Sequence, residues 1–408
     1  MVRTAHGARR RVVITGLGPV SCVGTGIGEF ERALREGRRG TGRVESFEAA
    51  GRPSAVGGAI PGFAPDTLLR RPAPQQRQWG RSALFAAAAA RLAADDAGLE
   101  PDGSRAAVVF GTTSGETPSL VQMVERWHRE GFGAPEPQVA ARVPASRLAL
   151  AAARELGTRG DVLTLGAACA AGNYALGYAY DLLTTGEADV AVAGGADSVD
   201  WLTHAGFHRT GALAEEVCRP FDLYRDGVVP AEGGSALVVE ELGHAEARGA
   251  RVYAEVLGWA MTCDAVSPNA QDAESITRCM RAAHRRAEVA ADEVDYICAH
   301  GTGTRMNESV EAEAVRAAFG GKPPPISSIK SMLGHAMGAA AGFGAIACAL
   351  SISGGFLPPT INHRDVDPEL ADLDVVANQS RAQTVRVAQN NGFGFGGNNA
   401  VALLGSVR

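Results

Sequence analysis

The feature that most constrains the fold is an alternation of short β-like runs with alanine-rich stretches along the chain. Helix candidates such as "GRSALFAAAAARLAADDAGL" (80–99) lie between the runs. Continuous apolar strands separated by helices are typical of an α/β fold with largely buried strands. The runs of the first half all end in small residues: "RRVVITGLG" (10–18), "AAVVFGTTSG" (106–115), "VLTLGAAC" (162–169) and "DVAVAGGAD" (189–197).

The second half repeats this pattern. "SITRCMRAAHRRAEV" (275–289) predicts a helix, "DYICAHGTGT" (295–304) a strand and turn, and "TVRVAQNNGFGFGGNNAVALLGSV" (384–407) two closing strands. "AVVFGTTSG" and "YICAHGTGT" look like related pieces at matching places, which indicates an internal duplication. The 408 residues exceed one simple core, and no low-complexity linker separates the halves. We therefore expect two halves, 1–250 and 251–408, packed as one body.

Charge and cysteine usage narrow the class of protein. The net charge of −6 comes without a basic block, which argues against a nucleic-acid binder. The seven cysteines show no CxxC pair or regular spacing, so neither a disulfide framework nor a zinc site is indicated. The N-terminal stretch lacks the apolar segment of a signal peptide. These features favour a cytoplasmic protein.

One uncharged segment resembles a membrane span. "AMGAAAGFGAIACALSISGGFLPPTIN" (336–362) is apolar mainly through alanine and glycine, and Gly-Gly and Pro-Pro pairs interrupt it. This composition favours a buried core helix with close helix packing over a bilayer helix. We therefore expect no membrane partner.

A single cysteine, Cys169, sits between a β-like run and a long apolar helix in "LTLGAACAAGNYALGYAYDLL" (163–183). Cysteine packs like a small hydrophobe, so a structural role is one interpretation. The other is a nucleophile: the unpaired N–H groups and dipole of a helix start favour a thiolate and lower its pKa. Small neighbours leave room for a substrate carbonyl, and the same N–H groups could bind an oxyanion.

Two further motifs place polar groups at glycine-rich turns. In "CAHGTGTRMNESVEAEA" (298–314), His300 ends a strand, and Thr302 and Thr304 could form the turn or offer hydroxyls to a polar ligand arm. The glutamates at 308 and 311 could simply be a solvated helix face.

In "SSIKSMLGHAMGAAAG" (327–342), Lys330 and His335 flank a turn before the uncharged helix. Only two of the chain's 39 basic residues are lysines, which makes a lysine in this motif notable. We expect His335 to be neutral and a hydrogen-bond donor. Metal ligation is discounted because no HxxxH or CxxC spacing supports it.

The glycine patterns do not indicate a nucleotide site. "GFGFGG" (392–397) matches G-x-G-x-x-G, but a strand and not a helix follows it. "GLGPVS" (16–21) has Ser21 where the third glycine belongs. The set that remains, one cysteine, two histidines and one lysine at glycine-rich junctions, suits acyl transfer through a thioester.

With these motifs in order, the chain resembles the β-ketoacyl-acyl-carrier-protein synthases, of the elongating Cys-His-His type found in fatty-acid and type II polyketide synthesis. The resemblance runs nearly end to end, through "RRVVITGLGPVSCVG", "AACAAG", "RPFDLYRDGVVPAEGGSALVVEE", "HGTGT", "IKSMLGHAMGAAAG" and "NGFGFGGNNA". It implies a thiolase-like fold of two similar βαβαβαββ halves in α-β-α-β-α layers, dimeric, with the active site where the halves meet.

The resemblance also implies a ping-pong reaction. Cys169 takes an acyl group from a carrier-protein or coenzyme A thioester, with the N–H groups of Cys169 and Phe395 as oxyanion hole. His300 and His335 then support decarboxylation of malonyl-carrier protein, and the carbanion attacks the acyl-cysteine to give a 3-oxoacyl product. No cofactor is implied beyond the phosphopantetheine that carries the substrates.

Supporting roles follow from the same resemblance. Lys330, paired with Glu311, would organise the histidines. Thr302 and Thr304 match positions that contact the phosphopantetheine arm. Phe395 matches a gate, and the glycines around Phe393 and Phe395 would let its loop swing. The expected partners are an acyl carrier protein and a second subunit, either an identical chain or a chain-length-factor-like homologue.

Four departures from the family pattern bear on the pathway. The loop "CDAVSPNAQD" (263–272) is short and lacks an aromatic residue and a histidine, Glu308 stands where aspartate is usual, and "VVPAEGGS" and "GGNN" replace more typical segments. They favour a specialised polyketide or polyene pathway over housekeeping fatty-acid elongation, which stays the alternative.

Two other functions of a ketosynthase-like chain remain open. A non-condensing partner subunit would lack the nucleophile, and Cys169, His300 and His335 are all present. An acyltransferase relative would load the cysteine without decarboxylating malonate. The initiating Cys-His-Asn type is disfavoured by the histidine in "GHAMG".

Overall fold

The fold is built on an 11-stranded mixed sheet, in a computed structural model that describes residues 10–45, 55–71, 76–100, 105–134, 136–267 and 269–407. The strand order is β11-β10-β14-β15-β9-β1-β8-β7-β5-β6, with β2 paired to β1. The strands of this sheet are β1 (Val12–Ser21), β2 (Gly24–Thr25), β5 (Ala106–Thr112), β6 (Val162–Gly166), β7 (Val190–Asp197), β8 (Gly233–Glu241), β9 (Ala254–Cys263), β10 (Tyr296–Cys298), β11 (Ile326–Ser327), β14 (Val387–Gly394) and β15 (Asn398–Gly405).

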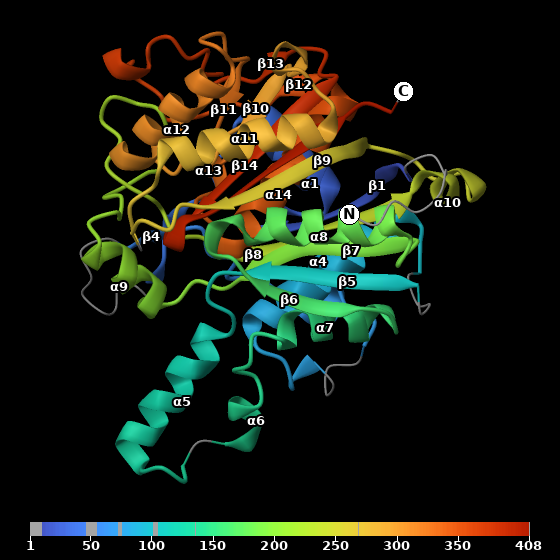
Figure 1. The fold of residues 1–408 in the computed structure, drawn as a ribbon. Helices are drawn as coiled ribbons and strands as arrows, with labels where there is room; N and C mark the ends of the chain where they lie inside the picture. The colour runs from blue at the N-terminus through green and yellow to red at the C-terminus, as the bar shows by residue number, and fades with distance from the viewer. Residues whose placement is uncertain are drawn as a thin grey trace.

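Two small ribbons and a set of helices complete the fold (Figure 1). The ribbons pair β3 (Gly42–Arg43) with β4 (Val56–Gly57), and β12 (Phe356–Leu357) with β13 (Arg381–Ala382). The α-helices are α1 (Ile27–Glu36), α4 (Arg81–Ala97), α5 (Thr117–Glu130), α6 (Pro137–Ala140), α7 (Arg147–Leu156), α8 (Ala171–Thr185), α9 (Trp201–Arg209), α10 (Leu242–Ala247), α11 (Ala273–Ala287), α12 (Arg305–Ala318), α13 (Lys330–Leu333) and α14 (Ala340–Gly354). The 3-10 turns are η1 (Pro65–Thr67), η2 (Ala168–Ala170), η3 (Ala291–Glu293), η4 (Met337–Ala339), η5 (Pro368–Leu370) and η6 (Phe395–Gly397).

The predicted duplication is visible in the order and pairing of the strands. When the extra helices, the short strands and the 3-10 turns are left out, the first half reads β1-α4-β5-α7-β6-α8-β7-β8, and the second reads β9-α11-β10-α12-β11-α14-β14-β15. Both sequences are βαβαβαββ, and in both halves two parallel pairings are followed by two antiparallel ones. The halves join where Val12–Ile14 of β1 pair with residues 254–256 of β9.

Helices and strands stack in the expected five layers. Helices α4 and α7 cover the outer face of the first half, and α11 and α12 cover that of the second. Helices α8 and α14 lie in contact between the two sets of strands. This α-β-α-β-α order confirms the expected thiolase-like fold.

The central helix α14 is the apolar segment that could have crossed a membrane. Residues Met337–Gly354 are long and apolar enough for a span, but 83% of that window is buried inside the protein. Its neighbours are β14, β8 and α8, so it is a core helix, as predicted from its alanine and glycine content.

Glycines let the two central helices cross closely near their first turns. A Cβ at Gly172 of α8 would lie 2.5 Å from the backbone nitrogen of Gly342 on α14, so no larger residue fits there. Because Cys169 precedes α8 and His335 precedes α14, this contact brings the candidate nucleophile of one half to a candidate site histidine of the other.

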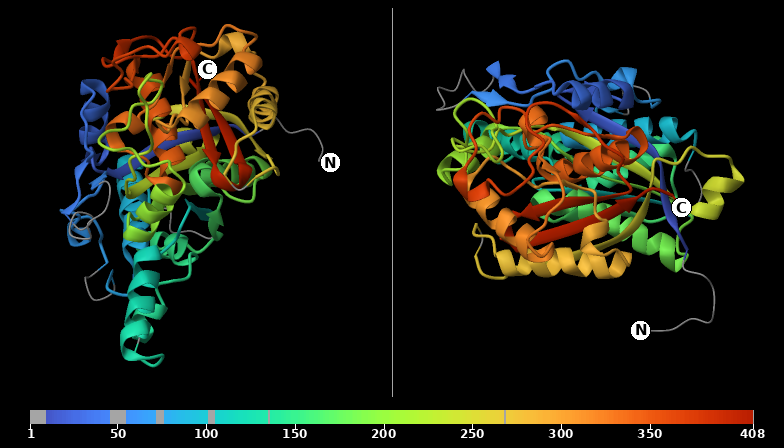
Figure 2. Two further views of the ribbon diagram at one scale, coloured as in Figure 1. Left: turned by 90° about the vertical axis from the view of Figure 1, so that its left-hand side faces the viewer. Right: turned by 90° about the horizontal axis from the view of Figure 1, so that it is seen from above.

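Two parts of the first half depart from the buried α/β pattern. Strand β6 is an edge strand, so the run "VLTL" is partly exposed and not fully buried as expected. Helices α5 and α6 project from the body as an arm (Figures 1 and 2). The arm occupies the place that the short "HGTGT" turn takes in the second half, since it follows β5 as that turn follows β10.

Candidate active site

The candidate nucleophile lies at a strained turn between β6 and α8. Cys169 is the middle residue of η2, and the preceding Ala168 has a left-handed φ of 47°. A non-glycine residue in this region is uncommon and marks a backbone held by its surroundings. Gly111 of β5 packs against this turn, because a Cβ there would lie 2.2 Å from the carbonyl oxygen of Ala171. The side chain of Cys169 is therefore placed by the backbone.

The protonation state of Cys169 differs from the one expected from a helix start. Burial raises the pKa of the thiol to about 11, and it outweighs the lowering by the charge of Lys330 and by the N–H of Phe395. The expected lowered pKa was therefore wrong for the free thiol of the folded protein. Desolvation, which a sequence does not reveal, keeps the sulfur protonated at neutral pH.

A cavity of about 610 Å³ opens onto this sulfur. It brings together groups from both halves, since Cys169 comes from the first half and both histidines come from the second. Of the residues singled out from the sequence, it is lined by Cys169, His300, Thr302, Thr304, His335, Phe393 and Phe395.

The two histidines face each other within this cavity. Their ring centroids are 5.6 Å apart and the rings are nearly perpendicular, at 84°. Burial and the charge of Lys330 lower the pKa of both His300 and His335 well below the ordinary value, so both rings are neutral. The N–H of Met337 donates to Nδ1 of His335 (3.1 Å), which assigns the proton to Nε2. His335 can therefore donate a hydrogen bond through Nε2.

Lys330 contacts the histidine loop in a different way from the expected one. Its Nζ donates to the carbonyl oxygen of His300 (2.5 Å), and no ion pair with Glu311 forms. Glu311 instead accepts the N–H groups of His300 and Gly301, both at 2.8 Å. The expected Lys330–Glu311 pair is thus wrong as a direct contact. The two side chains hold the backbone of His300 from opposite ends of the residue.

Glu308 and Glu311 both face the interior, so the solvated-face interpretation was wrong. Glu311 lies at the end of a buried chain of amides that sequence reasoning missed. Asn391 donates to Glu311 (2.9 Å), Gln389 donates to Asn391 (2.8 Å), and His284 shares a hydrogen bond with Gln389 (2.7 Å). In the sequence, only the polar residues within the otherwise apolar strand β14 could have indicated this series of hydrogen bonds.

Asp197 is a second site residue that sequence reasoning missed. Its buried carboxylate accepts from the hydroxyl of Thr112 and from the N–H groups of Thr113, Ser114 and Gly338. Burial raises its pKa to about 6. Because Gly338 follows His335, this aspartate fastens the histidine turn of the second half to the loop after β5. Its position at the end of a predicted strand was the one available signal.

The glycine-rich loop after β14 approaches Cys169. A Cβ at Gly394 would lie 3.0 Å from the nitrogen of Cys169, and the ring of Phe395 is 41% exposed. Asp264 anchors this loop, since its N–H donates to Gly397 and its carboxylate accepts from Asn399 (2.6 Å). The short 263–272 loop thus holds the candidate gate at its base.

The threonines of the "HGTGT" turn also face the cavity. Their hydroxyl oxygens are 3.0 Å apart, and that of Thr304 accepts the N–H of Asn307 at the start of α12. Among the described residues, no group of three or more His, Cys, Asp and Glu side chains could hold a metal ion. The strand β15 follows "GFGFGG", so no helix start is available there for a dinucleotide.

Comparisons with known proteins identify the family of this chain. The model of the β-ketoacyl synthase N-terminal domain matches residues 9–245, and that of the C-terminal domain matches residues 253–364. Nodulation protein E of Rhizobium meliloti is 36% identical, over 98% of this chain and 100% of its own length. 3-oxoacyl-[acyl-carrier-protein] synthase 2 of Synechocystis is also 36% identical, over 97% and 98%.

Two solved structures share the whole fold. The ishigamide ketosynthase/chain length factor is 45% identical, with a TM-score of 0.95 over 98% of this chain and 100% of that one. A type II polyketide ketosynthase, solved bound to a hexaketide and in complex with its acyl-carrier protein, is 31% identical with a TM-score of 0.90, over 98% and 100%.

Proposed function

This chain belongs to the β-ketoacyl synthase family of acyltransferases, and we propose that Cys169 is the residue that carries the acyl chain during its condensation reaction. The observation that carries the proposal is one cavity in which this thiol, two neutral imidazoles and the loop of Phe395 meet. The substrates arrive as thioesters on the phosphopantetheine of an acyl carrier protein, and no further cofactor takes part.

The first half-reaction moves the acyl group to the enzyme. The sulfur of Cys169 attacks the thioester carbonyl, the carbon–sulfur bond to the carrier breaks, and the carrier thiol leaves with the proton. The N–H groups of Cys169 and Phe395 hold the oxyanion; the closeness of Gly394 to the nucleophile turn supports this placement. Fixed N–H donors stabilise such charge without reorganising.

The second half-reaction forms the carbon–carbon bond. Malonyl-carrier protein loses carbon dioxide, and the resulting enolate oxygen accepts hydrogen bonds from His300 and His335. Neutral imidazoles suit this role, because each can donate an N–H hydrogen bond to the enolate oxygen and still keep its proton. The enolate carbon attacks the acyl carbonyl, the bond to Cys169 breaks, and the released thiolate takes a proton from water. The products are a 3-oxoacyl-carrier protein and carbon dioxide.

We propose a specialised polyketide or polyene pathway as the setting. The 45% identity to the ishigamide ketosynthase/chain length factor supports it, against 36% to 3-oxoacyl-[acyl-carrier-protein] synthase 2 of Synechocystis. The same neighbour supports a dimer, with an identical chain or a chain-length-factor-like partner. A cytoplasmic location fits the seven cysteines, which are all free.

Intact-mass spectrometry with labelled malonate tests the reaction. The protein is incubated with a panel of acyl-carrier proteins whose acyl chains differ in length. It is then incubated with malonyl-carrier protein that carries the label in the free carboxyl group of the malonyl unit. We expect an acyl adduct on Cys169, absent in Cys169→Ala, followed by labelled carbon dioxide and a 3-oxoacyl product. An adduct without carbon dioxide would indicate a non-decarboxylating acyltransferase. No adduct with any chain length would refute the proposed role of Cys169.

A further inference from the structure

The two halves carry matching turns in front of their central helices. The turn η2 leads directly into α8, and the turn η4 leads directly into α14. The first residue of each turn has a left-handed backbone, with φ of 47° at Ala168 and 50° at Met337. The second residue is Cys169 in η2 and Gly338 in η4. Gly338 therefore occupies in the second half the place that the proposed nucleophile occupies in the first.

The strands that pack against these turns also match, and each comes from the other half. Strand β14 contacts η2, and strand β7 contacts η4. Each strand lies between a parallel and an antiparallel neighbour. The last residue is Gly394 in β14 and Asp197 in β7. Gly394 has no side chain to place beside the N–H of Cys169, whereas the carboxylate of Asp197 accepts the corresponding N–H, that of Gly338 (2.7 Å).

Four neutral donors fix the position of the Asp197 carboxylate. Its Oδ1 accepts the hydroxyl of Thr112 (2.6 Å) and the N–H of Ser114 (3.0 Å). Its Oδ2 accepts the N–H of Thr113 (2.8 Å) as well as that of Gly338. An ionised carboxylate only accepts hydrogen bonds, so a full set of donors matches it and would not match an amide. The fully buried side chain thus joins the end of β5 to η4 in one fixed arrangement.

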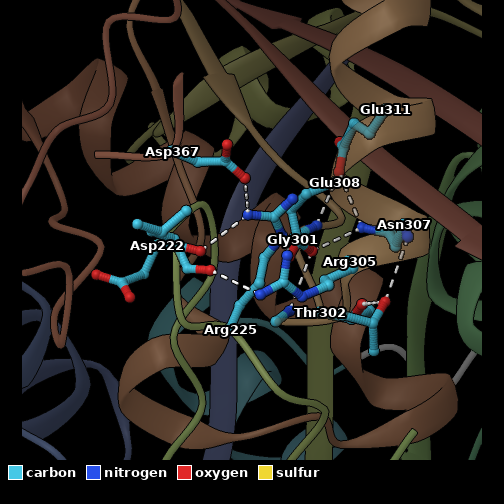
Figure 3. A network of polar contacts seen from close by, with 12 residues as sticks. Asp222, Arg225, Gly301, Thr302, Arg305, Asn307, Glu308, Glu311 and Asp367 are labelled. Atoms are coloured by element: carbon cyan, nitrogen blue, oxygen red, sulfur yellow. Dashed lines mark hydrogen bonds and ion pairs between the residues drawn. The ribbon is translucent and has the colours of Figure 1, made fainter. Parts of the chain in front are cut away.

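The turn of the first histidine is held by a buried carboxylate in a similar way. Figure 3 shows the network around α12, in which Glu308 and Glu311 have different partners. Glu308 faces the buried guanidinium of Arg225, whose Nε lies 3.4 Å from its Oε2. Glu311 accepts the backbone N–H groups of His300 and Gly301. Each histidine turn therefore has one carboxylate that binds its backbone, and for the second histidine that carboxylate comes from the end of β7.

The turn η4 controls the ring of His335 through the residue beside Gly338. The N–H of Met337 donates to Nδ1 of His335 (3.1 Å), and this contact keeps the ring proton on Nε2. Met337 has the left-handed backbone described above, which persists only where the surroundings hold it. The hydrogen bond from Gly338 to Asp197 is the adjacent restraint in the chain. Without this carboxylate the turn can relax, and Nδ1 of His335 then loses its donor.

We infer that Asp197 is a positioning residue for the decarboxylation step: it fills the second half's counterpart of the oxyanion hole, fixes η4 and so keeps His335 a donor through Nε2. This inference rests on the proposed function, because it needs His335 to bind the enolate oxygen. The two matching strands end differently, and that difference divides the work. Gly394 leaves the first turn open for a substrate oxyanion, and Asp197 closes the second turn with a carboxylate of the protein itself.

Chemical rescue by acetate tests the inference. Asp197→Gly copies the glycine at the end of β14 and leaves a space that matches acetate. We expect the release of labelled carbon dioxide from malonyl-carrier protein to fall about a hundredfold, because the imidazole no longer presents its N–H in the right place. Sodium acetate should restore at least about tenfold of this loss by supplying a carboxylate to the same donors. Sodium chloride at equal ionic strength should restore nothing.

A near-isosteric variant separates a missing carboxylate from a missing side chain. In Asp197→Asn the amide N–H₂ faces two N–H donors, so carbon dioxide release should fall as in Asp197→Gly. Acetate should have no effect, because the side chain still fills the space. In both variants the acylation of Cys169, measured by intact mass, should fall much less than carbon dioxide release.

A carboxylate at the opposite end of β14 provides the matched control. Asp295 accepts the backbone N–H groups of Arg386 and Val387 (2.7 and 3.2 Å), so Asp295→Gly also removes a carboxylate that binds backbone. Neither histidine turn contains these partners. Asp295→Gly should leave acylation and carbon dioxide release at the wild-type rate, with and without acetate.

The tautomer of His335 gives a measurement that does not depend on turnover. The protein is labelled with ¹⁵N-histidine, and the His335 signals are assigned from their loss in His335→Gln. We expect the wild-type ring to carry its proton on Nε2 alone. Asp197→Asn should show a mixture of both tautomers, and this variant decides the matter if Asp197→Gly fails to fold.

The outcomes separate the positioning role from the proposed function. Unchanged ¹⁵N signals of His335 in Asp197→Asn would overturn the positioning role. So would an equal loss of acylation and carbon dioxide release, or a folded Asp197→Gly protein that acetate does not rescue. Absence of an acyl adduct or of carbon dioxide release with the wild-type protein would instead overturn the proposed function.

Discussion

Alkylation of Cys169 across a pH series measures how far burial controls the nucleophile. Iodoacetamide reacts with the thiolate, so its rate follows the ionised fraction of the sulfur. The pKa of about 11 lies two units above the ordinary value of 9.0. At pH 8 about 0.1% of this thiol is ionised, against about 10% for an unperturbed one, a hundredfold difference.

The assay follows the labelling of each cysteine peptide by mass spectrometry between pH 6.5 and 9.5. We expect the rate at Cys169 to rise about tenfold per pH unit without reaching a plateau, because the whole range lies below its pKa. Cys263 is exposed and serves as the internal reference for reagent access.

A charge-removing variant tests the cause of this value. The ammonium of Lys330 lowers the pKa of Cys169, so Lys330→Met should slow labelling of Cys169 further. Burial also lowers the pKa of Lys330, and the comparison therefore belongs at the acidic end of the series, where the amine is charged. A rate that levels off near pH 8 would show an activated thiolate and refute the dominance of desolvation. Faster labelling in a folded Lys330→Met protein would refute the electrostatic role of the lysine.

Three further predictions concern residues around the site. Gly111→Ala should lower the free energy of unfolding by about 1–3 kcal/mol in chemical denaturation, because its Cβ meets the carbonyl of Ala171; an unchanged value would contradict the close packing. Glu311→Gln should slow carbon dioxide release from malonyl-carrier protein about ten- to a hundredfold, because one charge-assisted acceptor for the backbone around His300 is lost. Acylation measured by intact mass should stay near wild type, and an equal loss in both steps would contradict this positioning role. Burial raises the pKa of Glu308 from 4.5 to about 7. The stability that its protonated form contributes is therefore complete below pH 4.5 and is lost as the pH rises through 7. The free energy of unfolding should fall by on the order of 3 kcal/mol over this range. Glu308→Gln should remove that slope from unfolding free energies measured between pH 4.5 and 8, and an unaltered slope would refute the assignment.

Much of the architecture could be read from local pattern. The runs from 10–18, 106–115 and 189–197 all form strands where expected, because a short apolar run between turn signals has few other stable conformations. The edge position of β6 escaped prediction, since exposure depends on which neighbours a strand acquires. The same holds for the arm of α5 and α6.

The candidate site, too, could be predicted from the sequence only in part. The glycine-rich turns singled out from the sequence do meet in one cavity, because each ends a strand or begins a helix near the contact between the two halves. Asp197, Asn391 and Arg225 were missed, because a polar residue next to an apolar strand looks alike whether it is solvated or buried. Their partners lie far away in the chain and are adjacent only after folding.

The sequence by itself determined the repeated α/β order, the turn that presents Cys169 and the glycine-rich loops that surround it, because these depend on local backbone preferences. Only the tertiary structure decided that the thiol stays protonated, that Lys330 binds the carbonyl of His300, and that the buried Arg225 pairs with Asp367. Burial and charge act through space, and the distances that govern them exist only once the two halves have packed.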